Sequence, residues 1–332
     1  MAEPFVSIVT PVYNGQKYLA ECIESVITQT YQNWEYHITD NCSTDDSLKI
    51  AQSYAEKDQR IQVHSNKDFL AMVDNFNRSL EHISPASKYC KVVHADDLLL
   101  PACVTEMVSL AEKYPSIGIV SAYALDGVRI KCDGLPYPTS VFSGKEVARM
   151  SLMGKSPEDG GFLFVFGSPT SILMRAGLVR DRIPFYNRKY HQVVDQEACY
   201  YLLQLSDFGF VHQLLTYSRL HENSTTSSSQ LLNKLIFEEL ELLKEYGPIY
   251  LTQDEYDKRL KQRMTLYYRF LADCLLAGKE KTVWTYHKQG LAKLNMPICW
   301  TKLFGVAVRK LAHRAIYTIS HPKATFNGLK NK

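Results

Sequence analysis

The sequence lacks three features that mark particular protein classes. No apolar run reaches the ~18 residues that a membrane-spanning helix needs. None of the eight cysteines is spaced as CxxC, so neither a zinc site nor a redox motif is indicated. The first residues, "MAEPFVSIVTP", enter a strand pattern directly and show no leader-peptide pattern. We therefore expect a reduced, cytoplasmic protein.

Acidic residues are missing from the last part of the chain. After Glu280 there is no Asp or Glu, whereas ten Lys or Arg residues follow. Because the net charge of the whole chain is only +3, the preceding residues are net acidic. A separate basic region favours a polyanionic partner, either anionic lipid or nucleic acid. No nucleic-acid recognition motif accompanies the charge, so no nucleic-acid partner is expected.

The segment Cys299 to Ile319 predicts a helix with an apolar face. The apolar positions expected near one face are Trp300, Leu303, Phe304, Ala307, Leu311 and Ala315, and the cations around it are Lys302, Arg309, Lys310 and Arg314. This pattern fits a helix lying on an anionic membrane surface. A packing helix with a solvated basic rim is the alternative.

What is present is an alternation of strand and helix patterns over the first 125 residues. Apolar β-rich runs predict strands at 5–10, 34–39, 61–64, 89–94 and 117–122, and helical periodicity predicts helices at 17–28, 43–57, 70–81 and 101–113. Ser43 and Asp46 have the spacing of a capping box for the second helix. This order predicts an α/β fold with a mostly parallel sheet that is sandwiched by helices.

The remaining residues change character twice. Residues 126–229 are irregular and rich in Gly, Pro and aromatic residues, with helical patterns at 144–153 and 196–205 and two short strands, "FGFVH" and "LLTYSRLH". Residues 230–332 form a helical extension with breaks expected at Gly247-Pro248, Gly278 and Pro297. We therefore expect boundaries near residues 125 and 229.

Polar residues follow three of the predicted strands, in "PVYN", "DNCS" and "HADD". Ligands of open parallel sheets bind at the carboxyl ends of the strands. In "HADD", the carboxylates of Asp96 and Asp97 and the imidazole of His94 could coordinate a divalent cation, and the cation would neutralise a diphosphate. The alternative is that Asp96 or Asp97 caps the helix that starts near Pro101.

The other clusters also have two interpretations each. Asp40 and Asn41 could contact a base edge or a ribose hydroxyl. Tyr13 could stack on a nucleobase, or its segment could be an ordinary strand-to-helix turn. Asp45 and Asp46 suit the N-terminus of a helix through its dipole.

Two later segments carry further candidates. Asp195 in "HQVVDQEA" lies near a helix start, where it is either a cap or a general base. Arg219 and His221 are predicted to alternate on one strand face. The histidine could bind a metal and the arginine a phosphate, or both could be ordinary surface residues.

Taken in order, four segments resemble family 2 glycosyltransferases with the GT-A fold. They are "VSIVTPVYNGQKYLAECIESVITQTYQNWEYHITDNCSTDDS", "HADD", "VVDQEA" and "YSRLHENS", and the resemblance covers about residues 4–229. It implies a Rossmann-like nucleotide-sugar-binding half at 1–125 and an acceptor-binding half at 126–229. It also implies metal-dependent transfer of a sugar, with a UDP-sugar expected, to an acceptor hydroxyl with inversion.

The resemblance also implies residue roles by position. The base would lie against Pro11, Val12 and Tyr13, while Asp40 and Asn41 correspond to the acidic pair that contacts uracil. Asp96 would face the ribose and the metal, Asp97 would be the main ligand of Mn²⁺ or Mg²⁺, His221 would approach the metal or diphosphate, and Asp195 would be the catalytic base. The chain departs from the usual family pattern at Asn41, His94 and Val194, where acids are common.

The resemblance further implies a glycan or lipid-linked acceptor and a role in polysaccharide or glycolipid biosynthesis of the cell envelope, with a peripheral position on the inner face of the membrane. Two alternatives remain. One is a sugar nucleotidyltransferase, although "TPVYNGQKY" with its one Gly is a poor phosphate cradle. The other is a catalytically weak scaffold that binds nucleotide or glycan.

Overall fold

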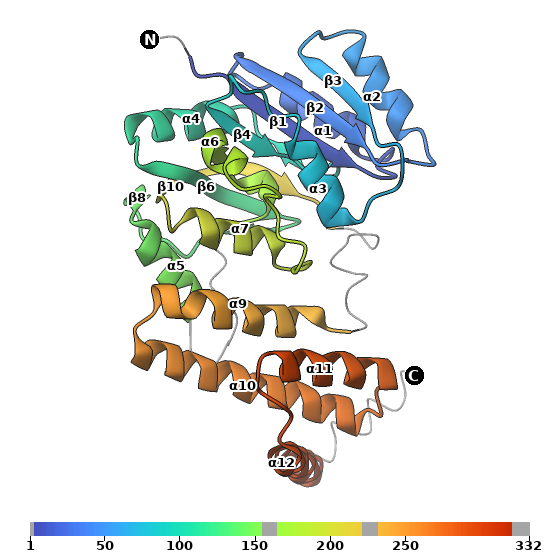
Figure 1. Cartoon of the computed structure of the whole chain (residues 1–332), viewed down its shortest axis with the longest axis vertical. Helices are drawn as coiled ribbons and strands as arrows, with labels where there is room; N and C mark the ends of the chain where they lie inside the picture. The colour runs from blue at the N-terminus through green and yellow to red at the C-terminus, as the bar shows by residue number, and fades with distance from the viewer. Residues whose placement is uncertain (1–2, 155–164, 221–231, 321–332) are drawn as a thin grey trace. The chain divides into compact units, whose positions relative to one another are not determined.

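The structure, a computed structural model, describes residues 3–154, 165–220 and 232–320. The chain divides into two compact units, Met1–Ser224 and Thr225–Lys332. The first unit is an α/β domain and the second is helical (Figure 1). None of the described helices combines the length and the apolar character that crossing a bilayer requires.

The first unit is built on one sheet. Within the described residues the sheet has ten strands: β1 (Val6–Val12), β2 (Trp34–Asp40), β3 (Ile61–Ser65), β4 (Tyr89–Val92), β5 (Leu98–Leu99), β6 (Ile117–Asp126), β7 (Arg129–Lys131), β8 (Val141–Phe142), β9 (Leu173–Arg175) and β10 (Asp207–Ser218). The main order is β3-β2-β1-β4-β9-β6-β10-β5. The first four strands of this order are parallel, as are β6 and β10, and the short β9 joins the two sets by running antiparallel to β4 and β6.

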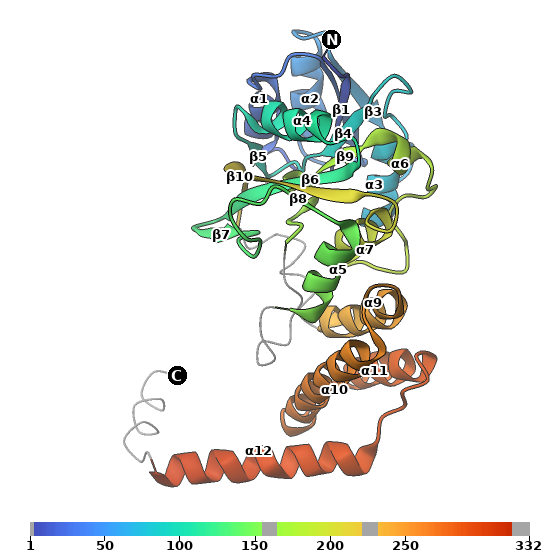
Figure 2. The ribbon, with the colours of Figure 1, turned by 90° about the vertical axis from the view of Figure 1, so that its left-hand side faces the viewer.

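Helices cover both faces of this sheet. One face carries α1 (Leu19–Ile27), α2 (Ser47–Ala55) and α4 (Cys103–Lys113), and the other carries α3 (Met72–Leu80), α6 (Ala176–Arg180) and α7 (Val194–Leu202) (Figures 1 and 2). The unit also contains α5 (Gly144–Met153) and a 3-10 turn, η1 (Pro169–Ser171). The α/β prediction and the helical C-terminal extension are confirmed.

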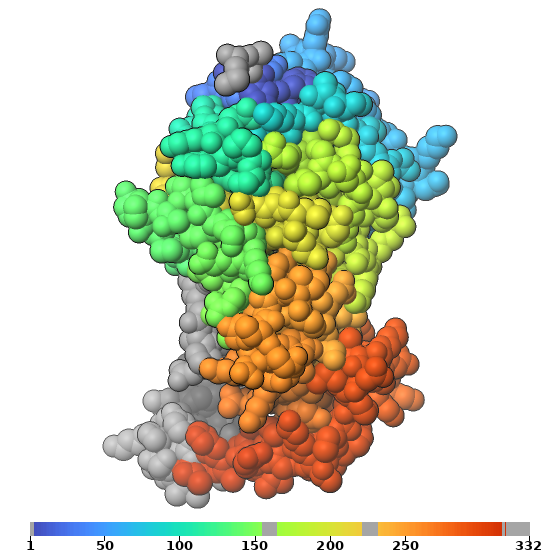
Figure 3. Space-filling model, turned by 60° about the vertical axis from the view of Figure 1, so that its left-hand side comes forward, coloured from blue at the N-terminus to red at the C-terminus, as the bar shows by residue number. Residues whose placement is uncertain are grey.

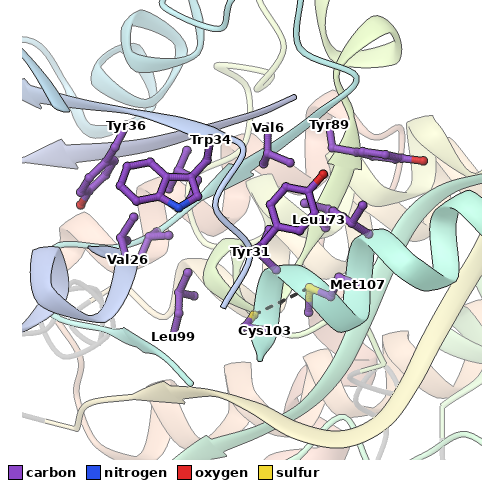
Figure 4. Close-up of a cluster of buried hydrophobic side chains, with 14 of the residues drawn as sticks. Val6, Val26, Tyr31, Trp34, Tyr36, Tyr89, Leu99, Cys103, Met107 and Leu173 are labelled. Atoms are coloured by element: carbon purple, nitrogen blue, oxygen red, sulfur yellow. Dashed lines mark hydrogen bonds between the residues drawn. The ribbon is translucent and has the colours of Figure 1, made fainter. Parts of the chain in front are cut away.

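The main core lies between the sheet and α1, α2 and α4. Trp34, Tyr36 and Tyr89 from the strands pack with Val26 of α1 and Met107 of α4 (Figure 4). Trp34 and Tyr36 share a sheet face because side chains two residues apart point the same way. Burial of such aromatic side chains contributes on the order of 25 cal/mol per Å² of apolar surface, so this face anchors the strand ends that carry the polar clusters.

The capping-box prediction for the second helix is wrong. The helix begins at Ser47 with Asp46 as its N-cap residue, and no side chain caps it. The Ser43 hydroxyl instead accepts the backbone N–H of Asn14, and Asp45 accepts the backbone N–H groups of Gln16 and Ser47. These residues therefore tie the loop after β1 to the loop after β2, which sequence spacing alone does not distinguish from a cap.

The two short strands predicted at 208–212 and 214–221 form one long strand as far as Ser218. β10 runs without a break from Asp207 to Ser218, and its register against β6 shifts between Val211 and Leu214 and again before Thr216. These bulges interrupt the apolar alternation, which is why the sequence suggested two strands. Because β10 ends at Ser218, Arg219 follows the strand and does not alternate with His221 on its face. His221 lies outside the described residues.

The described part of the second unit, up to Ser320, is helical from Lys234. Its helices are α9 (Lys234–Tyr250), α10 (Gln253–Leu276), α11 (Lys281–Lys293) and α12 (Trp300–Ser320). The predicted breaks near Gly278 and Pro297 are confirmed, but α9 continues through Gly247-Pro248. Pro248 lies in the last turn of α9, where the helix can lack one backbone hydrogen bond without breaking.

The predicted apolar face of α12 is divided in the structure. Leu303 and Ala307 are buried in the core of the second unit, which also contains Tyr268 of α10. Trp300, Phe304 and Leu311 are exposed. The outer surface of α12 is visible along its length in Figure 3, in red. The single apolar face predicted from sequence is thus two stripes, because one side of the helix packs on α10.

Candidate active site

Three strand ends place the polar clusters along one edge of the sheet. β1 lies between β2 and β4 and is parallel to both, and Val12 is in register with Asp40. Tyr13, Asp40 and His94 therefore follow neighbouring strands at their carboxyl ends. Pro11 and Val12 are buried within β1, and Val12 belongs to the core. Any contribution of these two residues to a base-binding wall would be made chiefly by their backbone.

Asp40 presents a buried oxygen with no protein partner. Its side chain is 3% exposed, and Oδ2 accepts the backbone N–H of Ser43 at 3.2 Å. Among the described residues Oδ1 has no hydrogen-bond donor. Leaving a buried acceptor unsatisfied is unfavourable by about 1–3 kcal/mol, so this oxygen is suited to an N–H group of a ligand.

The side-chain amide of Asn41 is bonded to the segment before α3. Its Nδ2 donates to the carbonyl of Leu70 at 2.9 Å, and its Oδ1 accepts the N–H of Leu70 at 2.9 Å. Oδ1 also accepts from Asn66 Nδ2 at 2.9 Å. The amide therefore holds the segment before α3 in place, and a nucleobase N–H would have to displace one of these bonds.

The segment that Asn41 holds brings an aromatic residue to Tyr13. The rings of Tyr13 and Phe69 meet edge to face with centroids 4.9 Å apart, and both residues are exposed. Exposed aromatic pairs of this kind are suited to planar ligands. The sequence analysis missed Phe69, because it belongs to neither a strand end nor a recognised motif.

The acidic pair of "HADD" is gathered with a histidine. One possible ligand atom from each of His94, Asp96 and Asp97 lies within 4.8 Å of the others. The capping alternative is wrong, since α4 begins only at Cys103, with Ala102 as its N-cap residue and no side-chain cap. The sequence already pointed to this imidazole as a possible ligand beside the two carboxylates, although the family resemblance assigned the metal to Asp96, Asp97 and His221.

Asp97 is the most enclosed member of this cluster, at 4% exposed. Its Oδ2 accepts from the hydroxyls of Thr170 at 2.8 Å and Ser218 at 3.2 Å, and Oδ1 accepts the backbone N–H of Arg219 at 3.2 Å. His94 Nδ1 is 3.7 Å from Oδ2. Burial raises the pKa of Asp97, and the electrostatic interaction with His94 opposes this rise.

These residues fit a divalent cation. The groups that hydrogen-bond Asp97 are neutral, while the guanidinium of Arg219 pairs with Glu21 and lies over the ring of Tyr18. A buried carboxylate is unfavourable until a positive charge approaches it, and His94 supplies such a charge only when it is protonated. Two carboxylates and an imidazole are also ligand types that Mn²⁺ and Mg²⁺ proteins use. His221, the third predicted ligand, lies outside the described residues.

Asp195 is the second residue of α7 and does not cap it. The N-cap residue is Val193, and the Asp195 carboxylate accepts the N–H of Gln196 at 2.9 Å. Burial raises the pKa of Asp195 to about 6, although the Gln196 bond and the charge of His94 oppose the rise. A carboxyl with such a pKa is suited to accept a proton near neutral pH. Glu197 points elsewhere and pairs with Arg182 at 2.8 Å.

The α/β sheet with helices on both faces resembles the GT-A fold of glycosyltransferases. The family model described as "Glycosyl transferase family 2" matches residues 7–139. This segment of the chain is therefore similar to family 2 glycosyltransferases.

Two curated relatives illustrate the match. An "uncharacterized glycosyltransferase" of Haemophilus influenzae is 27% identical over 226 residues, which is 68% of each chain. The "putative teichuronic acid biosynthesis glycosyltransferase TuaG" of Bacillus subtilis is 34% identical over 95 residues, 29% of this chain and 37% of that protein. The chain thus spans about two thirds of the first relative and little more than a third of the second.

Two solved structures share the fold. Staphylococcus aureus TarS 1–349 in complex with UDP-GlcNAc has a TM-score of 0.57 and 19% identity, over 80% of this chain and 73% of that one. The mannosyltransferase PcManGT of Pyrobaculum calidifontis, in complex with GDP-Man and Mn²⁺, has a TM-score of 0.52 and 13% identity, over 94% and 88% of the two chains.

Proposed function

We propose that this protein transfers a sugar from a UDP-sugar to an acceptor hydroxyl with inversion of the anomeric centre. The observation that carries the proposal is the grouping of His94, Asp96 and Asp97 at the end of β4, within electrostatic reach of Asp195. A group suited to a metal and a diphosphate would thereby act together with a carboxylate whose pKa is raised.

The donor would bind along the carboxyl edge of the sheet. The base would contact the Tyr13–Phe69 pair and donate an N–H to the buried Oδ1 of Asp40, which has no donor among the described residues. Uracil N3–H meets that requirement. The TarS structure, which contains UDP-GlcNAc, supports the choice of a uridine nucleotide, and the GDP-Man complex of PcManGT names the competing donor.

The metal would be Mn²⁺ or Mg²⁺, held by Asp97 and Asp96 with His94 beside them and His221 as a further candidate. When bound, such an ion would stabilise the negative charge that develops on the leaving diphosphate. Asp97 is already oriented by Thr170 and Ser218, so its carboxylate needs little rearrangement to act as a ligand.

The chemistry proposed for Asp195 is proton removal from the acceptor hydroxyl. As that proton moves to the carboxylate, the hydroxyl oxygen forms a bond to the anomeric carbon. The bond from that carbon to the diphosphate oxygen breaks, and the nucleoside diphosphate leaves with its electron pair. One displacement of this kind inverts the configuration at the anomeric carbon.

The acceptor is proposed to be a glycan or a lipid-linked glycan of polysaccharide or glycolipid synthesis. The printed name of TuaG, which refers to teichuronic acid, supports this class. Acceptor contacts are expected from residues 126–229, beside Asp195.

A donor screen tests the proposal. The full chain would be incubated with Mn²⁺ and each of a panel of UDP- and GDP-sugars, and melting temperature and nucleotide release would be measured. Stabilisation by one UDP-sugar, followed by UDP release with an acceptor present, is expected. Binding without release would favour the scaffold alternative, and formation of pyrophosphate from UTP and a sugar phosphate would favour a nucleotidyltransferase.

A peripheral membrane position on the cytoplasmic side is also proposed. Trp300, Phe304 and Leu311 form an exposed stripe on α12, and no acid follows Glu280. Two neighbouring cations are engaged within the unit, since Lys302 lies over the ring of Tyr268 and Lys310 pairs with Asp273. Attraction to anionic lipid would therefore depend on the other cations of the region. Vesicles with and without anionic lipid, sedimented with the full chain, test this proposal, and equal binding to both would exclude the electrostatic part.

A further inference from the structure

A lysine is completely buried in the strand that leads to the acidic cluster. Lys91 of β4 is 0% exposed, and its ammonium donates to the carbonyls of Thr170 at 2.6 Å and Ile172 at 3.2 Å. Its Nζ is also 3.7 Å from Met107 Sδ, in the core shown in Figure 4. Burial lowers the pKa of Lys91. Such burial is unfavourable unless the hydrogen bonds are specific, so the partners of Lys91 point to its role.

Those partners belong to the turn around η1, which we call the 166–172 turn. Gly167 has φ +80, and a Cβ there would lie 2.5 Å from the Cβ of Ser171. The Ser171 hydroxyl is bonded to Thr216 of β10 at 3.2 Å, and Ser121 of β6 donates to the carbonyl of Phe166 at 2.8 Å. The turn is therefore fixed to two strands by hydroxyls and to β4 by Lys91.

The turn delivers one hydroxyl to the site. Thr170 is fully buried, and its Oγ1 donates to Asp97 Oδ2 at 2.8 Å while accepting the backbone N–H of His94 at 3.1 Å. Because the hydroxyl has a single proton, accepting from His94 leaves that proton for Asp97. The carbonyl of the same residue is the closer partner of Lys91. Thr170 thus connects Lys91 to Asp97, with its carbonyl bonded to Lys91 and its hydroxyl bonded to Asp97.

We propose that Lys91 is a positioning residue that orients Asp97 through Thr170 for metal binding. The inference rests on the proposed function, because it gives Asp97 the role of a ligand. Groups that hydrogen-bond a metal ligand fix its orientation, and their loss typically weakens metal affinity about 10- to 100-fold. Lys91 would act one step further out, by keeping the Thr170 backbone where its hydroxyl meets Asp97.

The competing explanation is that Lys91 only fills the core. In that case its replacement would lower the stability of the first unit without a specific effect on metal affinity. The test therefore measures Mn²⁺ affinity separately from stability, using the full chain with saturating UDP, titration calorimetry for Mn²⁺ and melting temperature for stability.

Three variants carry the test. Lys91→Met removes the ammonium but keeps the length of the side chain, Thr170→Val removes the hydroxyl, and Thr170→Ser retains it. We expect Lys91→Met and Thr170→Val to weaken Mn²⁺ binding about 10- to 100-fold. Thr170→Ser should bind Mn²⁺ nearly as the wild type does. The Lys91→Met/Thr170→Val double variant should bind Mn²⁺ with about the same affinity as the weaker-binding single variant. Both changes break the same connection, so their effects on Mn²⁺ affinity should not add.

Ser7→Ala is the matched control. Ser7 is equally buried on β1 and bonded to Glu35 and Ser87, none of which contacts Asp97 in the structure. It should lower the melting temperature and leave Mn²⁺ affinity unchanged.

The outcomes separate the two proposals. If folded Lys91→Met binds Mn²⁺ as tightly as the wild type does, Lys91 does not position Asp97. If Thr170→Val also binds Mn²⁺ as tightly as the wild type does, Thr170 does not orient Asp97 for metal binding either. If Lys91→Met does not fold, the proposal is judged on the difference in Mn²⁺ affinity between Thr170→Val and Thr170→Ser. Equal Mn²⁺ affinity in these two variants overturns it. If the wild type itself binds UDP but no Mn²⁺, the metal dependence of the proposed function fails, and the positioning proposal fails with it.

Discussion

Asn41 and Leu70 are joined by two hydrogen bonds of 2.9 Å, one in each direction between the side-chain amide and the backbone. Asn41 follows β2, whereas Leu70 precedes α3, so this pair fixes the segment that carries Phe69 beside Tyr13. Family members with an acid at the position of Asn41 would lack the donated N–H. Asn41, where family members usually have an acid, therefore stabilises the segment before α3 through its hydrogen bonds to Leu70.

Replacing Asn41 should release that segment. In Asn41→Asp the new carboxylate faces the carbonyl of Leu70, to which Asn41 donates. The lost bond and the repulsion should weaken UDP binding by about tenfold, on the order of 1–1.5 kcal/mol for one hydrogen bond. Titration calorimetry with UDP measures the effect. Tighter UDP binding would instead show that an acid at position 41 contacts the base directly.

Phe69 and Tyr13 should both contribute to nucleotide binding. Stacking of a base on an aromatic side chain is worth about 1–3 kcal/mol, so Phe69→Ala and Tyr13→Ala should each weaken UDP binding about 5- to 150-fold. Tyr114→Ala, at an exposed aromatic residue after α4, is the control and should bind UDP normally. Unchanged binding in both single variants would exclude the aromatic pair from the site.

Asp195→Asn should remove the proposed base. We expect kcat to fall about 10²- to 10⁴-fold while the affinity for UDP is retained, because Asp195 is assigned to the acceptor. Burial raises the pKa of Asp195 to about 6, so the wild-type rate should decline as the pH falls below about 6 and the carboxylate is protonated. Rate–pH profiles from pH 5 to 8 check this, with Asp46→Asn, at an exposed site, as the control. Normal turnover in Asp195→Asn would show that another group is the base.

The same substitution should stabilise the folded protein. Since burial raises the pKa of Asp195 from 3.8 to about 6, the folded state binds the proton more tightly than the unfolded state does. The stability linked to this proton is complete below about pH 4 and is lost as the pH rises through 6. Asp195→Asn, which carries no charge, should therefore melt a few degrees higher than the wild type at pH 8 but not at pH 4. An equal or lower melting temperature at pH 8 would argue against a raised pKa of Asp195.

Three histidines make the first unit sensitive to acid. His37 Nδ1 and His64 Nε2 are 3.0 Å apart, and the rings of His64 and His82 stack with centroids 3.6 Å apart. Burial, together with the charges of His64, His37 and Arg78, lowers the pKa of His82 to about 4, and burial and the charge of His37 lower that of His64. Glu35 is an acidic residue that faces these histidines, with its Oε1 atom 3.3 Å from His37 Nε2.

The direction of the pH effect follows from these shifts. Because the unfolded histidine binds its proton near pH 6.5, stability is complete above that pH and is lost as the pH falls from 6.5 towards 4. Denaturant unfolding from pH 7.5 to 4.5 should show this decline, and His82→Gln should flatten it. A slope that is unchanged in His82→Gln would assign the acid sensitivity to other groups.

The sequence by itself determined most of the parallel half of the fold. The apolar runs that became β1, β2 and β4 are dictated by burial on both faces of the sheet, and the turn residues after them mark where the strands end. "HADD" was identified as a polar cluster at a strand end because a charged pair directly after an apolar strand is a local feature. Asp195 was identified for the same reason, as an acid at a helix start.

Only the tertiary structure decided which distant residues complete the site. Phe69, Thr170 and Lys91 become relevant through contacts with residues many positions away, to which local periodicity is insensitive. Lys91 in particular lies in an apolar strand pattern, and only the carbonyls of the 166–172 turn explain why a cation is buried there. The bulges of β10 and the division of the apolar surface of α12 have the same origin, since packing against neighbours, and not local preference, set them.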